Sequence, residues 1–173
     1  MRMVGTVFRA HHPRWSFAPE SGQGAAIHGG RFNRAGVPAL YTSVRMETAW
    51  LEAQQGFAFK AQPTTLCAYD VDCDDLVDLT DPGACGALGI AADDLACPWE
   101  YLRVTGGTPP SWTLADRLIA AGRAGIKVRS FAPGATGLDV NVVFWRWAPT
   151  PPHRVKVIDD QGRLPLNDLS RRK

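Results

Sequence analysis

The sequence predicts an α+β fold, with a mixed or antiparallel β-sheet and a few helices in one domain. Segments rich in β-forming residues outnumber segments with helical periodicity, but both kinds are present. No internal repeat or low-complexity linker divides the 173 residues. We therefore expect one domain over residues 1–173, with a core over about 4–160 and a polar tail over 161–173.

The N-terminal part predicts two strands separated by a long loop. Residues 4–10 alternate and are rich in β-formers, so they are expected to form the first strand. Residues 11–30 contain Pro13, Pro19 and several glycines, which favours a loop. Residues 39–42 form a short apolar run and are expected to be the second strand. Long irregular loops in small domains are often functional, so the predicted loop over 11–30 is a place to look for a site.

A helix is predicted over about 45–55, with Ser43 as its N-cap. Glu52 lies one turn beyond Thr48, on a face next to the apolar one. That position is the margin between a core and a cleft. The residues expected to face the core share helical spacing: Met46, Ala49, Trp50 and Ala53.

The rest of the chain predicts strands and one clear helix. The helix spans 112–122, with Gly122 or Gly125 as its end, and a shorter helix is expected near 91–103. The expected strands are runs of apolar or alternating residues, at 64–72, 76–79, 126–130, 140–147 and 154–158.

Composition narrows the class of protein. Hydrophobic residues make up 45% and charged residues 21%, as in globular domains, and the net charge of +2 comes without a long basic run. This argues against a direct nucleic-acid binder. With no apolar stretch of signal-peptide or membrane-spanning length, we expect a cytoplasmic protein without membrane contact. The four cysteines form no Cys-x-x-Cys pair, so we expect free buried thiols and no metal.

One stretch carries residue types suited to a nucleotide with a reactive glycosidic bond. Arg31 follows Gly29 and Gly30, and a guanidinium can hold a phosphate with two hydrogen bonds. Tyr41 could stack on a flat heterocycle, and Glu52 could stabilise a sugar cation. Each residue judged alone also has an ordinary explanation: a surface arginine after a turn, a core aromatic ring and a solvated helix residue.

Two further residues are candidates with the same ambiguity. Arg9, at the end of the first strand, is either a second phosphate ligand or an exposed cation. Ser130 ends a strand and is either part of the site or a serine that bonds its own turn. It does not lie in a Gly-x-Ser-x-Gly motif, and the chain has neither a Walker loop nor Gly-x-Gly-x-x-Gly.

Taken together, these motifs resemble the RES domain, the toxin half of a bacterial toxin–antitoxin system. The resemblance covers most of the chain, and Arg129 stands where a proline is expected in the family. The matching motifs occur in the family's order: Phe8-Arg9, Gly29-Gly30-Arg31-Phe32-Asn33, Gly36, Leu40-Tyr41-Thr42-Ser43, Leu51-Glu52, Val128-Arg129-Ser130 and Asn141.

The resemblance implies a fold similar to ADP-ribosyltransferase toxins and NAD⁺ as co-substrate, without a metal. The nicotinamide–ribose bond would be cleaved. Arg31 and Arg9 would bind the phosphates or ribose, and Tyr41 would pack on the nicotinamide side. Glu52 would hold the ribose hydroxyl and stabilise the oxocarbenium-like centre, and Ser130 would contact the ligand from the opposite wall. The expected NAD⁺-binding residues are Arg9, Gly30, Arg31, Asn33, Tyr41 and Ser43.

The resemblance leaves the fate of ADP-ribose open. We favour transfer to a cellular protein, with NAD⁺ glycohydrolase or phosphorylase activity as the alternative. A non-catalytic nucleotide-binding module is the second alternative. The family also implies a cognate antitoxin with a helix-turn-helix DNA-binding domain, one segment of which would block the cleft.

Overall fold

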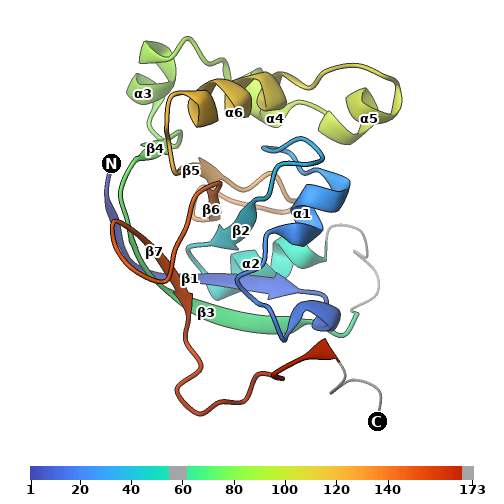
Figure 1. Ribbon diagram of the computed structural model, residues 1–173. Coiled ribbons are helices and arrows are strands. Elements are labelled where there is room, and N and C mark those ends of the chain that lie inside the picture. The colour runs from blue at the N-terminus through green and yellow to red at the C-terminus, as the bar shows by residue number, and fades with distance from the viewer. Residues whose placement is uncertain (55–61, 169–173) are drawn as a thin grey trace.

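The computed structural model describes residues 1–54 and 62–168 and shows an α+β domain built on one seven-stranded sheet (Figure 1). The strand order is β4-β5-β6-β2-β1-β3-β7, and β4 with β5 is the parallel pair in an otherwise antiparallel sheet. The predicted mixed sheet is therefore confirmed. The strands are β1 Met3–His11, β2 Leu40–Ser43, β3 Thr65–Cys73, β4 Leu76–Asp78, β5 Gly125–Arg129, β6 Val140–Phe144 and β7 His153–Val157.

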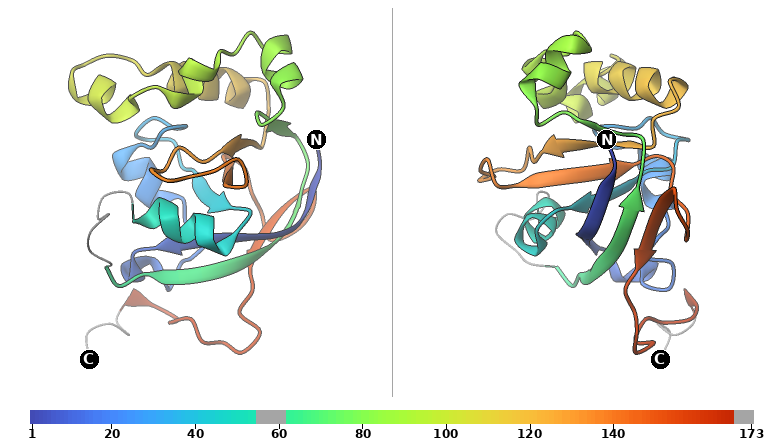
Figure 2. Two further views of the ribbon diagram at one scale, coloured as in Figure 1. Left: turned by 180° about the vertical axis from the view of Figure 1, so that it is seen from behind. Right: turned by 90° about the vertical axis from the view of Figure 1, so that its left-hand side faces the viewer.

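The sheet has two arms joined at a narrow seam. Nine residue pairs align β1 with β3, whereas β1 and β2 are joined by the single pair of Phe8 and Ser43. In the right-hand view of Figure 2, β5 and β6 run across the direction of β1, β3 and β7. The candidate site described below is lined by residues of both β1 and β2, which meet at this seam.

The helices lie over the arms of the sheet. Leu114 and Leu118 of α6 and Leu95 of α4 pack on Ile126 and Val128 of β5 in one buried cluster. A second buried cluster joins side chains of strands β1, β3 and β7 with side chains of β2, β4 and β6. The helices are α1 Gln23–His28, α2 Met46–Ala53, α3 Pro82–Ala87, α4 Ala92–Ala96, α5 Trp99–Val104 and α6 Pro110–Ala120, with a 3₁₀ turn, η1, at Pro13–Trp15.

Three predictions about helices were wrong in detail. Residues 11–30 are not one loop, because they contain η1 and α1. The helix expected near 91–103 is two helices, since the chain is extended at Cys97 and Pro98 follows it. Helix α3 was not predicted, because its Pro-Gly-Ala-Cys-Gly-Ala sequence has weak helix propensity; Asp81 caps it through Gly83 N–H and Ala84 N–H.

Helix α2 has the predicted extent but a different orientation. Its N-cap is Arg45, not Ser43, which remains in β2. Met46 and Trp50, expected in the core, are 48% and 43% exposed, whereas Thr48 is fully buried. Ala49, also expected in the core, is buried as predicted. The polar anchoring of Thr48, described below, turns the side of α2 that carries Thr48 and Ala49 inward.

The cysteines are free, as predicted. Cys67, Cys73 and Cys97 are buried and Cys85 is partly buried. In the described part of the chain, no helix is both long and apolar enough to span a membrane.

Candidate active site

A cleft of about 550 Å³ lies at the seam of the sheet, between β1, α1, α5 and the start of β2. A smaller pocket of about 280 Å³ adjoins it on the α2 side. Five residues line both the cleft and the smaller pocket, so the two compartments meet at these side chains. These shared residues are Arg9, His11, Tyr41, Glu52 and Asn141.

The loop that carries Arg31 is held rigidly by its backbone. The carbonyl oxygens of residues 30, 31 and 32 accept hydrogen bonds from Trp112 Nε1, Ser111 Oγ and Trp145 Nε1, at 2.7, 2.6 and 2.8 Å. Helix α6 supplies two of these donors, and Trp145, the residue after β6, supplies the third. A loop with each successive carbonyl tied to the core presents its side chains in one arrangement.

Gly30 is required by close packing against Tyr41. A Cβ at this position would lie 2.5 Å from the Tyr41 hydroxyl oxygen and 2.8 Å from Asn33 Oδ1. The sequence had suggested that glycine lets the backbone approach a ligand. Gly30 does border the cleft, but the close approach that excludes a side chain is to Tyr41.

Asn33 is part of the scaffold of this loop and does not line the cleft. It is 1% exposed. Its Nδ2 donates to the carbonyls of Ala25, Arg34 and Val37 at 2.9, 3.1 and 2.9 Å, and its Oδ1 accepts from Tyr41 at 2.7 Å. These bonds use the side chain fully. In the structure Asn33 supports the loop from within, and its expected contact with NAD⁺ stays a prediction.

Arg31 projects into the cleft with its guanidinium partly fixed. Nη1 donates to the carbonyls of Cys97 and Leu95 at 2.6 and 3.3 Å, and Phe131 stacks 4.7 Å from the guanidinium carbon. Burial lowers the pKa of Arg31, but an arginine stays charged at neutral pH. Because both hydrogen bonds come from Nη1, the rest of the guanidinium fork is oriented and suited to an anion.

Arg9 faces the cleft from the opposite arm of the sheet. Its Nη1 donates to the carbonyls of Pro19 and Ser21 at 2.7 and 3.1 Å, and burial lowers its pKa. Tyr69 donates to the same Pro19 carbonyl at 2.8 Å. The expected alternative, an exposed surface cation, is therefore excluded. Two partly buried cations, Arg9 and Arg31, thus border one cleft.

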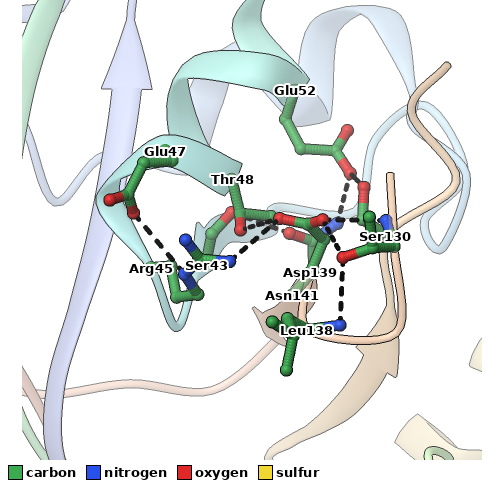
Figure 3. A network of polar contacts seen from close by, with 10 residues as sticks. Ser43, Arg45, Glu47, Thr48, Glu52, Ser130, Leu138, Asp139 and Asn141 are labelled. Atoms are coloured by element: carbon green, nitrogen blue, oxygen red, sulfur yellow. Dashed lines mark hydrogen bonds and ion pairs between the residues drawn. The ribbon is translucent and has the colours of Figure 1, made fainter. Parts of the chain in front are cut away.

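Glu52 is held by two donors that converge on one oxygen (Figure 3). Ser130 Oγ and Asn141 Nδ2 both donate to Glu52 Oε1, each at 2.5 Å. Ser43 Oγ in turn donates to Asn141 Oδ1 at 2.7 Å, which fixes the amide orientation. Ser130 was expected to contact a ligand from the opposite wall, and in the structure its hydroxyl donates to Glu52.

A family model matches the part of the chain that contains the cleft residues described above. The model of the RES domain matches residues 6–167, which include each residue of the cleft described so far. The chain belongs to the RES domain family. No curated protein matches its sequence.

A solved structure shares the fold of this RES domain. A chain of the crystal structure of the M. tuberculosis MbcT–MbcA toxin–antitoxin complex superimposes with a TM-score of 0.64. The two sequences are 22% identical, and the match covers 92% of this chain and 84% of that one. At this identity the likeness establishes the fold.

The cleft of this RES domain is rich in cationic groups. Besides Arg9 and Arg31, it is lined by Arg14 and Arg103, against the carboxylates of Glu52 and Glu100. Such a cleft attracts an anionic ligand. Among the described residues, no group of three or more His, Cys, Asp or Glu side chains could hold a metal ion.

Several lining residues were not predicted from the sequence. Asn141 appeared in the family motifs without a role. His11 and His12 were not among the candidate residues. Helix α5 contributes Trp99, Glu100 and Arg103, which only the fold brings to the cleft.

The variant Tyr41→Phe removes the hydroxyl of Tyr41 and keeps its ring, so it tests the two groups separately. The hydroxyl accepts from Phe32 N–H at 2.9 Å and donates to Asn33 Oδ1, so Tyr41→Phe leaves two buried groups unpaired. We expect the free energy of unfolding to fall by about 1–3 kcal/mol. Because the ring remains, the KM for NAD⁺, the expected co-substrate, should change less than about two-fold. Tyr101→Phe, at a 65% exposed position, is the matched control. Loss of turnover with unchanged stability would instead place the hydroxyl in the chemistry.

His11 is expected to make stability depend on pH. Burial lowers its pKa from 6.5 to about 4, so the unfolded chain binds a proton between these values that the folded protein does not. Stability should therefore decrease as pH falls from about 6.5 towards 4. Denaturant unfolding measures the free energy of unfolding at pH 7 and at pH 5. Between these pH values it should fall by about 1–2 kcal/mol more in wild type than in His11→Gln. An equal pH dependence in both proteins would contradict this assignment.

Proposed function

We propose that this protein is the toxin of a toxin–antitoxin system that cleaves the nicotinamide–ribose bond of NAD⁺ and transfers ADP-ribose to a cellular protein. The observation that carries the proposal is the carboxylate of Glu52, held by Ser130 and Asn141 at the junction of two compartments. Arginines border the larger compartment, which has the volume of a small-molecule site.

The residues suit the chemistry of this bond. When the C–N bond breaks, its electron pair leaves with nicotinamide, and positive charge develops on the ribose carbon. A carboxylate already fixed by two hydrogen bonds stabilises that charge without having to reorganise. Arg31 and Arg9 would neutralise the pyrophosphate and so fix the dinucleotide in the cleft. No proton transfer to the leaving group is needed, which agrees with a cleft whose His11 stays neutral at pH 7.

The two compartments give separate places to NAD⁺, the donor of ADP-ribose, and to the group that accepts ADP-ribose. Glu52 borders both the larger, arginine-lined cleft and the smaller pocket beside α2. The pyrophosphate would occupy the first, so that the reacting ribose lies at the junction. An acceptor other than a protein side chain is the second candidate: water gives a glycohydrolase and inorganic phosphate gives a phosphorylase. Each uses the same Glu52 geometry.

The partner belongs to the proposal as well. The similar solved structure is a toxin–antitoxin complex, and this supports a cognate antitoxin for the present chain. We propose that this antitoxin has a helix-turn-helix DNA-binding domain and inserts a segment into the cleft.

One experiment separates the outcomes. Purified protein is incubated with NAD⁺ labelled in the adenosine part, in phosphate and in phosphate-free buffer, with and without a cell lysate. Label on a protein band supports the transferase, free ADP-ribose the glycohydrolase, and a phosphorylated ADP-ribose the phosphorylase. Saturable NAD⁺ binding without nicotinamide release over hours would overturn catalysis and favour the non-catalytic binding module.

A further inference from the structure

A buried carboxylate with no assigned role lies beside the glutamate clamp, the name used here for Ser130 and Asn141, which hold the carboxylate of Glu52. Asp139 is 7% exposed and immediately precedes β6, two residues before Asn141. Its side chain accepts hydrogen bonds from two different parts of the chain. Oδ1 accepts from Thr48 Oγ1 at 2.6 Å, and Oδ2 accepts from the backbone N–H and the hydroxyl of Thr136 at 2.8 and 2.9 Å. Figure 3 shows the link between Asp139 and Thr48, next to the contacts of Glu52.

The backbone of Asp139 reaches the other half of the clamp. Its carbonyl accepts from Ser130 N–H at 2.7 Å, and Ser130 is one of the two donors to Glu52. Asp139 is therefore tied to α2 by its side chain, to Ser130 by its backbone and to Asn141 by two peptide bonds. Through these links, one residue connects the helix that carries Glu52 with both residues that hold its carboxylate.

Helix α2 has few other buried anchors. Thr48 and Ala49 are its buried residues, while Met46 and Trp50 are exposed. Thr48 lies four residues before Glu52, so it sits one turn away on a similar face of the helix. A hydrogen bond that fixes Thr48 consequently fixes the position and rotation of the turn from which Glu52 projects.

The charge of Asp139 strengthens this anchor. Hydrogen bonds from Thr48 and Thr136 lower the pKa of Asp139 to about 2, so the carboxylate is ionised at neutral pH. Arg45 Nη1 lies 3.9 Å from Oδ1 and adds a cation at the start of α2. A hydrogen bond to an ionised acceptor is stronger than one between neutral groups, and this one is shielded from water.

We propose that Asp139 is a positioning residue for the reaction, which acts through Thr48 to hold α2 and thereby Glu52 against Ser130 and Asn141. This inference rests on the proposed role of Glu52. The chain offers a matched pair of variants, since Asp139 has one bond to α2 and a separate set to its own turn. Thr48→Val removes the link to the helix, whereas Thr136→Val removes a hydroxyl of the turn and leaves the Thr136 N–H bond in place.

The test combines steady-state nicotinamide release with hydrogen exchange of the α2 amides. For Thr48→Val we expect kcat to fall by about 10- to 100-fold, because a small displacement of a catalytic group is costly. KM should change less than about two-fold, because the arginines that hold the substrate are untouched. Thr48→Ser, which keeps the hydroxyl, should return kcat to within about three-fold of wild type, and Thr136→Val should stay at that level. Exchange in α2 should be faster in Thr48→Val alone.

The outcomes separate this inference from the proposed function. Unchanged kcat or unchanged α2 exchange in folded Thr48→Val overturns it, as does an equal loss of kcat in Thr136→Val. If wild type itself releases no nicotinamide, the proposed function fails. The anchoring of α2 is then decided by the exchange comparison of Thr48→Val with Thr136→Val alone.

Discussion

Glu52→Gln is expected to lower kcat for nicotinamide release by about 10²- to 10³-fold, the scale found when one preorganised electrostatic group is removed. Glutamine has the same shape, and its Oε1 can still accept from Ser130 and Asn141. The fold and the position of the side chain should therefore persist. The substitution removes the negative charge that, in the proposed reaction, would face the developing ribose cation. Nicotinamide release under saturating NAD⁺ measures the effect, and growth after induction in cells tests toxicity.

The matched control is Glu47→Gln on the same helix. Glu47 lies in the first turn of α2, its side chain is 67% exposed, and its ion pair with Arg45 spans 3.6 Å. Glu47→Gln removes the same charge from α2 at a residue that does not line the cleft, so nicotinamide release should stay within about two-fold of wild type. Normal turnover by purified, folded Glu52→Gln would refute the role given to Glu52. An equal loss in both variants would indicate a general charge effect.

Asn33→Asp is expected to destabilise the fold by about 3–5 kcal/mol, the largest stability change that we predict. The substitution turns the Nδ2 donor, which serves the carbonyls of Ala25, Arg34 and Val37, into a carboxylate oxygen facing the same three oxygens. The residue is 1% exposed, so water cannot replace the lost donors. Equilibrium unfolding in urea measures the loss.

The comparison for Asn33 is Gln23→Glu, the same change from an amide to a carboxylate at an exposed position. Its unfolding free energy should differ from wild type by less than about 0.5 kcal/mol. Should Asn33→Asp fail to fold, Asn33→Ser tests the same idea with a smaller defect. A stable Asn33 variant with a raised KM for NAD⁺ would contradict the scaffold role and restore the expected contact with the ligand.

Local patterns were sufficient for most of the strands and for the extent of α2. Alternation and β-propensity are local properties, so the seven strands were each predicted near their observed positions. The short helices were harder, because α3 and α5 have few residues and weak periodicity. The predicted core face of α2 was right at Ala49 but wrong at Met46 and Trp50, because the apolar pattern was assumed to decide burial. In the structure, the hydrogen bond from Thr48 to Asp139, 91 residues away, decides it.

The sequence by itself determined the residue types of the site. The order of arginine, tyrosine, glutamate and serine pointed to the family, which the family match confirms, and predicted a site for a nucleotide. Only the tertiary structure distinguished Arg31 and Arg9, which border the cleft, from Asn33, which is saturated by backbone carbonyls. It also showed that Ser130 holds Glu52 and that Asn141 shares this task. The reason is physical: a residue type fixes which bonds a side chain can make, but its partners come from segments brought together by folding.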